Sequence, residues 1–98
     1  MTRDDVFERL RDDRDALGAY RVRSLAVFGS VARGEMREGS DVDILVEFES
    51  GACIGLFEFV RLQRHLAELL GAPVDLVTPA ALRHELRESI LREAVHAA

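Results

Sequence analysis

Apolar positions along the chain follow helical spacing in some segments and strand composition in others. In the first segment, residues 2–17, the apolar side chains form a broken helical stripe made of Val6, Phe7, Leu10 and Leu17. Thr2 fits the N-cap of this helix, with Asp5 three positions later in a variant of the capping box. Gly18 suits the position after the last helical residue. We therefore expect one helix over residues 2–17.

Three segments are rich in β-branched and apolar residues, as strands are. They are residues 22–28 (VRSLAVF), 41–48 (DVDILVEF) and 74–77 (VDLV). Gly29 breaks the chain after the first of them, and a short helix over Ser30 to Arg33 is expected after this break. These segments predict at least three strands.

Two further helices are expected in the second half of the chain. Residues 56–70 carry an apolar face at spacings of three and four, formed by Phe59, Leu62, Leu66 and Leu69. Gly71 and Pro73 end this helix. Thr78 and Pro79 resemble an N-cap followed by proline in the first turn. The remaining chain is expected to be helical, with a stripe of Leu82, Leu86, Ile90 and Ala94.

This order of elements predicts an α+β (mixed α/β) fold. A small sheet of three or more strands, mostly antiparallel or mixed, would be flanked by helices. No repeat, linker or low-complexity segment interrupts the 98 residues. We therefore expect a single domain over residues 1–98.

Composition and charge narrow the class of protein. The net charge of -5 argues against nucleic acid as the main partner, because phosphate contacts need a basic face. No apolar run approaches the ~20 residues that span a bilayer, and the charged N-terminus lacks the apolar region of a signal peptide. A cytoplasmic protein without a membrane partner is expected, with its single Cys53 unpaired. The histidines lack partners at metal spacing and are expected on the surface: His65, His84 and His96.

Asp41 and Asp43 stand at the start of the second expected strand. Side chains two apart on a strand point to the same face, so these carboxylates would project together while Val42 packs inward. Carboxylates at this spacing suit metal cations, and Mg²⁺ held partly by substrate phosphates fits best. A D-x-D pair at a strand start is also common as solvated turn residues. The pair alone leaves both interpretations open.

Two further features favour the metal interpretation. Gly29 and Ser30 lie at a strand-to-helix turn, where backbone N–H groups and the helix dipole form an anion site. The alternative is an ordinary turn with Ser30 as the N-cap. Asp75 is flanked by apolar residues, and beside the 41–48 strand it would complete a cluster of carboxylates. Its alternative is an edge-strand residue that faces water. Together these residues predict metal-assisted nucleotidyl transfer.

The stretch GSVARGEMREGSDVDILVEF resembles the signature G-S-x-A-R-G-x(n)-S-D-x-D-L-x-V of minimal nucleotidyltransferases. These are small domains of the DNA-polymerase-β-like superfamily, and Ile44 in place of the usual leucine is a conservative difference. The resemblance continues through GAPVDLV, which is similar to the family's third-aspartate strand, to the closing helix LRESILREAV. It covers most of the chain and implies a polymerase-β-like nucleotidyltransferase fold.

The resemblance also implies which residues hold the nucleotide, expected to be ATP. Gly29 and Ser30 would bind its phosphates. Arg33 would face the phosphates or, alternatively, pair with Glu35 or Asp41 on the helix surface. These residues form the implied phosphate-binding half of the site.

The catalytic half implied by the resemblance consists of the three aspartates. Asp41 and Asp43 would bind a pair of Mg²⁺ ions. Asp75 would be the third carboxylate of the metal site, near the attacking hydroxyl, and would help to remove its proton. All three would therefore be both catalytic and metal-binding residues.

Larger relatives carry a second domain that binds the acceptor, and only about twenty residues follow the third strand here. The resembled family typically acts on a partner, a helical HEPN-domain toxin, as an antitoxin that adds AMP from ATP to a tyrosine hydroxyl. We take this as the leading hypothesis. Alternatives are an antitoxin that neutralises its partner by binding alone, or transfer to a small molecule. A thin core and exposed apolar stripes also suggest a homodimer or a hetero-oligomer.

Overall fold

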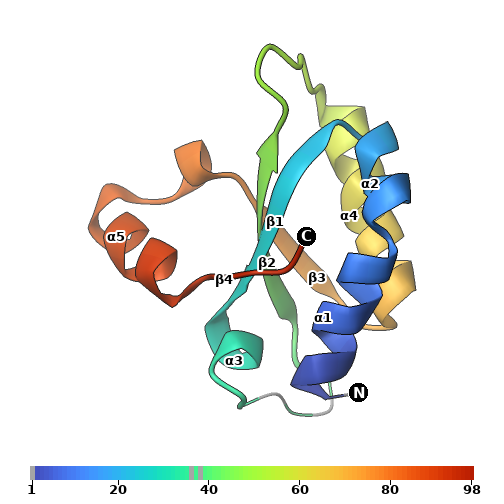
Figure 1. Ribbon diagram of the computed structural model, residues 1–98. Coiled ribbons are helices and arrows are strands. Elements are labelled where there is room, and N and C mark those ends of the chain that lie inside the picture. The colour runs from blue at the N-terminus through green and yellow to red at the C-terminus, as the bar shows by residue number, and fades with distance from the viewer. Residues whose placement is uncertain (1, 36, 38) are drawn as a thin grey trace.

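The computed structural model describes residues 2–35, 37 and 39–98. Within these residues the centre of the fold is a four-stranded sheet in the order β3-β2-β1-β4 (Figure 1). The strands are β1 (Val22–Phe28), β2 (Val42–Phe48), β3 (Val74–Val77) and β4 (Val95–His96). β1 runs antiparallel to β2 and β4, whereas β2 runs parallel to β3. The predicted mixed sheet is confirmed.

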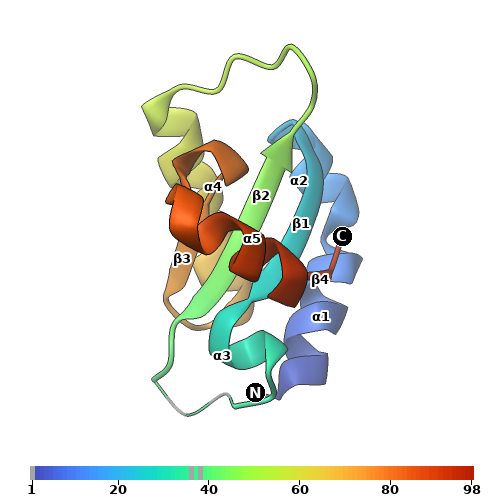
Figure 2. The ribbon, with the colours of Figure 1, turned by 90° about the vertical axis from the view of Figure 1, so that its left-hand side faces the viewer.

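Helices lie on both sides of this sheet. They are α1 (Arg3–Asp12), α2 (Arg14–Ala19), α3 (Gly29–Ala32), α4 (Leu56–Leu70), the 3-10 helix η1 (Pro79–Ala81) and α5 (His84–Glu93). α1, α2 and α4 cover one face, whereas α5 lies on the opposite side (Figures 1 and 2). No helix in the described part of the chain is long and apolar enough to cross a membrane.

The hydrophobic core fills the space between the sheet and the three helices α1, α2 and α4. Alternate residues of the strands enter it: Leu25, Val27, Val42, Ile44, Val46, Val74 and Leu76. The helices contribute Val6, Leu10, Leu17, Leu62, Leu66 and Leu70. Burial of each such side chain stabilises the fold by about 1.5–3 kcal/mol. This face therefore supplies most of the hydrophobic stabilisation.

The helix α4 has the predicted bounds, but its buried stripe is rotated from the predicted one. Its buried side chains are Leu62, Leu66 and Leu70. Phe59 and Leu69 are only partly buried, because the spacing of four along Leu62, Leu66 and Leu70 is the row that meets the core. Gly71 closes the helix in the left-handed conformation with φ 65, as its place after the last helical residue predicts.

The N-terminal segment forms two helices, which corrects the single helix expected over residues 2–17. The capping box of Thr2 and Asp5 is confirmed. Asp13, however, separates α1 from α2, and its Oδ2 atom lies 2.6 Å from the Nε2 atom of His65 in α4. The contact with His65 and the low helix propensity of aspartate both favour a break at Asp13. Gly18 consequently lies inside α2, and His65 is partly buried rather than a free surface residue.

The C-terminal segment also differs from the continuous helix expected from Pro79 onward. It forms η1, α5 and β4, so that Leu82 and Ala94 lie outside the helices. The chain turns extended at Ala94 and then pairs with β1, where the Ala97 N–H donates to the carbonyl of Leu25 at 2.8 Å. The physical reason is the otherwise unpaired edge of β1, which offers backbone hydrogen bonds to this segment. His84 and His96 are exposed, as expected.

Candidate active site

The turn between β1 and α3 places Gly29 against the side chain of Asp43. Gly29 has a φ of 70, in the left-handed region that favours glycine. A Cβ atom at this position would overlap the Oδ2 atom of Asp43. Glycine is therefore required both by the backbone and by the neighbouring carboxylate.

The short helix α3 begins one residue earlier than predicted. Phe28 is its N-cap, so Ser30 lies inside the helix and the alternative of Ser30 as N-cap is wrong. The first N–H groups of a helix have no partner within the helix and point outward from its start. The turn therefore presents backbone donors close to the carboxylate of Asp43.

Asp41 and Asp43 lie at the beginning of β2. The strand starts at Val42, one residue later than predicted, so Asp41 lies directly before it. Val42 is fully buried, Asp43 is partly exposed and Asp41 is exposed. The expected alternation, with Val42 inward and Asp43 on the opposite face, is confirmed.

Asp75 on β3 is aligned with Asp43 across the sheet. The two residues are register partners in the parallel pair formed by β2 and β3, and neighbouring strands lie about 4.8 Å apart. β3 is the edge strand, and Asp75 is exposed. Asp75 thus faces water, as the edge-strand alternative expects, and its strand lies beside β2, which the cluster interpretation requires.

Burial raises the pKa of Asp43, and the negative charges of Asp75 and Asp41 raise it further. Arg33 acts in the opposite direction, while Glu93 of α5 adds to the rise. Like charges near one another disfavour the ionised form. The charged form of Asp43 is thus destabilised in the folded protein, and a cation bound among these carboxylates would relieve the repulsion.

Arg33, at the end of α3, pairs with two glutamates. Its Nε donates to Oε2 of Glu35 at 3.1 Å, and its Nη1 donates to Oε1 of Glu93. These hydrogen bonds raise the pKa of Arg33. The predicted pairing with Glu35 is confirmed, and the second partner is Glu93 rather than Asp41. The sequence offers no signal for Glu93, which lies 60 positions away.

The donor set suits Mg²⁺ by its chemistry. This ion prefers oxygen ligands and is usually held by one or two carboxylates together with substrate phosphates. Within residues 2–35, 37 and 39–98, no group of three His, Cys, Asp or Glu side chains is placed to hold an ion unaided. Asp41, Asp43 and Asp75 therefore do not form a preformed three-carboxylate metal site among the described residues.

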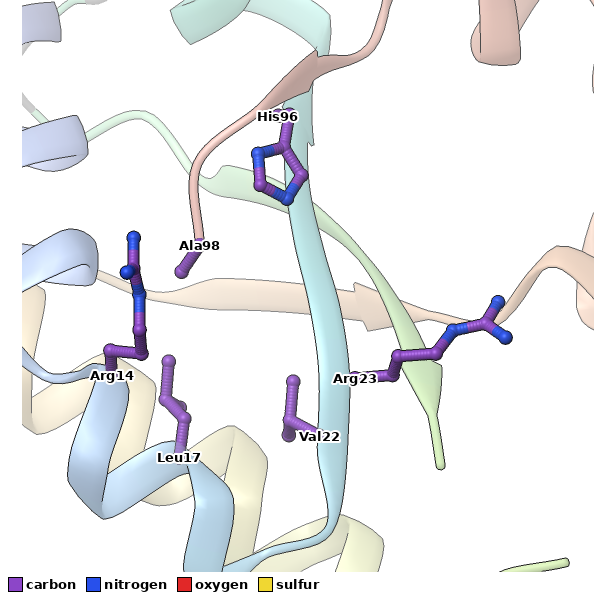
Figure 3. A pocket seen from close by; sticks show the side chains of 6 residues that line it. All are labelled: Arg14, Leu17, Val22, Arg23, His96 and Ala98. Carbon is purple, nitrogen blue, oxygen red and sulfur yellow. The ribbon is translucent and has the colours of Figure 1, made fainter. Parts of the chain in front are cut away.

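A cavity of about 320 Å³ lies elsewhere, between α2, β1 and the chain end (Figure 3). Its lining residues are Arg14, Leu17, Val22, Arg23, His96 and Ala98. The side chain of Arg23 points away from that of Arg14 in Figure 3, and Arg23 pairs with Glu47. The cavity does not gather its positive charges at one point and contains none of the three aspartates.

The chain matches the model of the nucleotidyltransferase domain over residues 7–96. It belongs to the nucleotidyltransferase domain family. The match runs from within α1 to the end of β4 and so includes the Gly29 turn and all three aspartates. This nucleotidyltransferase therefore carries its family's fold around the site described above, as the sequence resemblance predicts.

Known proteins similar to this nucleotidyltransferase extend the comparison. The protein adenylyltransferase MntA of Thermococcus cleftensis is 46% identical over 77 residues, which cover 79% of this chain and 76% of MntA. A solved structure assigned to a minimal nucleotidyltransferase is 41% identical, covers 97% of this chain and 95% of its own, and superposes with a TM-score of 0.81.

The fold also recurs in a toxin–antitoxin complex. That structure, a tri-AMPylated Shewanella oneidensis HEPN toxin with its MNT antitoxin, matches at 18% identity and a TM-score of 0.66. The match covers 93% of this chain and 70% of the other. At this level of identity the likeness concerns the fold.

Proposed function

We propose that this nucleotidyltransferase is an antitoxin that transfers AMP from ATP to a tyrosine hydroxyl of a partner HEPN toxin in a Mg²⁺-dependent reaction. The observation that carries the proposal is the alignment of Asp43 with Asp75, beside Asp41 and against the Gly29 turn. The relative MntA is named a protein adenylyltransferase, and the similar complex contains an AMPylated HEPN toxin. Both support a protein as the acceptor.

The phosphate-binding side of the site is assigned to the turn after β1. Backbone N–H groups of Gly29 and Ser30 would donate to the phosphates, because the start of α3 leaves them without helical partners. The Ser30 hydroxyl is a further donor. Arg33 lies at the other end of α3, and Glu35 and Glu93 orient its guanidinium.

The acidic side of the site is assigned to Asp41, Asp43 and Asp75, which would hold two Mg²⁺ ions. When bound, Mg²⁺ would neutralise the charge of the triphosphate and favour in-line attack. The tyrosine oxygen forms a bond to the α-phosphorus of ATP, and the bond to the bridging oxygen of the β-phosphate breaks, so that pyrophosphate leaves. Asp75, which is exposed at the sheet edge, would accept the hydroxyl proton and pass it to solvent.

The acceptor side of the reaction must come from another chain in this proposal. Residues 1–98 would act as one domain, in the cytoplasm, and form a hetero-oligomer with the toxin. The exposure of Asp75 on an edge strand supports this arrangement, because a hydroxyl on a partner protein can reach it from solvent.

The test uses the protein co-expressed with a candidate HEPN-domain partner encoded in the same genome. After incubation with ATP and Mg²⁺, the partner should gain mass in whole AMP units. The Asp41→Asn/Asp43→Asn variant should produce no gain, whereas Asp12→Asn, at an exposed position of α1, should behave as the wild type. A partner that stays unmodified with the wild-type protein would refute the transferase activity.

A second candidate is neutralisation of the partner by binding alone. It is favoured by α5, which buries none of its side chains and exposes 52% of Leu86 and 44% of Leu91. In that case the Asp41→Asn/Asp43→Asn variant would protect cells from the toxin as well as the wild type does. Loss of protection with intact complex formation would exclude this candidate.

A further inference from the structure

Glu93 lies on α5 and places a carboxylate near the proposed phosphate site. α5 itself packs only loosely against the rest of the fold. α5 has no buried side chain, and it meets α3 near the end that carries Glu93. The ion pair between Glu93 and Arg33 links α5 to the end of α3, the short helix that follows the Gly29 turn. Glu93 thus joins α5 to the element that carries the proposed phosphate-binding turn.

The pair with Glu93 is better sheltered from water than the other pair of Arg33. The side chain of Glu93 is 26% exposed, whereas that of Glu35 is 63% exposed. Salt bridges weaken with exposure because water and salt screen them. Water and salt therefore screen the pair with Glu93 less than the pair with Glu35.

The ion pair with Glu93 occupies an N–H group of Arg33 that could otherwise bind a phosphate. Arginine binds carboxylate and phosphate with the same fork of N–H donors. A nucleotide phosphate that reached Arg33 would therefore compete with Glu93 for this guanidinium and would also meet the negative charge of Glu93.

We propose that Glu93 is a positioning residue that holds the Arg33 guanidinium away from nucleotide phosphates, lowers nucleotide affinity at the Gly29 turn and ties α5 to α3. This inference rests on the proposed function only in that it takes a nucleotide to bind at this turn. Nucleotide binding and the attachment of α5 are then linked, since both depend on Arg33.

The first experiment measures the equilibrium Kd of Mg²⁺–AMP-PNP for three forms of the protein. Glu93→Gln should bind about two- to five-fold more tightly than wild type, the effect of one unit charge a few ångströms from the phosphates in a water-like medium. The gain should shrink at high salt. Glu88→Gln is the matched control, because Glu88 lies on the same helix, pairs with Arg92 and is 82% exposed.

The direction of the change separates positioning from a merely structural role. A variant that only loosened the fold would bind more weakly or with a smaller active fraction. An unchanged or weaker Kd in Glu93→Gln would overturn the inference. If Glu93→Gln fails to fold, Glu93→Asp replaces it, and an affinity no tighter than wild type would then overturn the inference.

The second experiment measures amide hydrogen exchange. Exchange in α5 should be faster in Glu93→Gln than in wild type, while exchange in α4 stays the same. Equal α5 exchange in both forms would overturn the proposed tie. If the wild-type protein binds AMP-PNP but does not modify its partner, the proposed function is refuted. The comparison of Kd values still tests the role of Glu93 in that case. Wild-type protein that binds no nucleotide would refute both.

Discussion

The helices α1, α2 and α4 lie over one face of the sheet (Figures 1 and 2). Aliphatic side chains fill the space beneath them, whereas Asp43 lies on the opposite face, with Asp75 in register on the neighbouring strand. Along β2, Val42 and Ile44 are fully buried, while Asp43 between them is partly exposed. The face beneath these helices, called the covered face below, supplies most of the stabilisation, and the opposite face, where Leu45 is also buried, carries carboxylates that repel one another. Along β2, residues that stabilise the core and the candidate site residue Asp43 therefore occupy alternate positions.

This separation has an energetic consequence. Apolar residues on the covered face stabilise the folded state because they leave water. Burial and nearby negative charges destabilise the ionised form of Asp43 in the folded state, and its pKa is therefore raised. Substitutions on the two faces should therefore affect stability and transfer in opposite ways.

The largest effect is expected from Asp43→Asn. Transfer to the partner should fall by about a thousandfold or more, since an anchoring carboxylate contributes several kcal/mol to the transition state. Without Mg²⁺ the Tm should rise by a few degrees, because the like-charge repulsion is gone. Intact mass against time and scanning calorimetry measure the two effects. A lower Tm would contradict the separation of the faces.

The next largest effect is a loss of stability without a loss of transfer, and it is expected from Leu66→Ala on the covered face. Leu66 is fully buried, so its truncation should reduce the free energy of unfolding by about 2–5 kcal/mol. Transfer measured well below the new Tm should stay close to wild type. Leu91→Ala on α5 is the control, since this side chain is 44% exposed and should cost under about 0.5 kcal/mol. Urea unfolding measures both; equal losses would refute the assignment of the core.

Gly29→Ala tests the close contact between the turn after β1 and the side chain of Asp43. Its positive φ is shared by Gly71, where an added Cβ meets nothing within 4 Å. Gly71→Ala should therefore cost about 1 kcal/mol of stability and leave transfer unchanged. Gly29→Ala adds the overlap with Asp43 and should reduce transfer by about a hundredfold. Similar transfer rates for the two variants would show that contact with Asp43 is unimportant.

The smallest expected effect is a pH dependence of stability. The folded pKa of Asp43 is raised, so the folded state holds this proton more tightly than the unfolded chain does. Its contribution to stability is present below the unfolded pKa and is lost as pH rises through the folded value. The Tm gain of Asp43→Asn over wild type should grow from about pH 4 to about pH 7 in metal-free buffer. A gain independent of pH would contradict the raised pKa.

Several features of the fold and of the candidate site could be predicted because they depend on neighbours along the chain. Val42 and Asp43 take opposite faces since a strand alternates. Gly29 follows β1 at a turn with positive φ, and Thr2 with Asp5 forms a capping box. In each case the interacting groups lie within a few residues of one another.

Other features depend on segments that are distant in the sequence. Asp13 interrupts the N-terminal helix where it meets His65, 52 positions away. Ala94 turns extended because the edge of β1 accepts the chain, and Glu93 ends next to Arg33 for the same reason. The helical spacing of residues 79–94 contains no trace of these partners.

The sequence by itself determined the alternation along β2 and the glycine at the turn, and it singled out the three aspartates as candidate site residues, because these follow from local geometry and side-chain chemistry. Only the tertiary structure decided that β3 lies parallel beside β2 with Asp75 in register with Asp43. It alone also brought Glu93 to Arg33. Register and helix placement are set by burial and backbone pairing between distant segments, and no single segment encodes them.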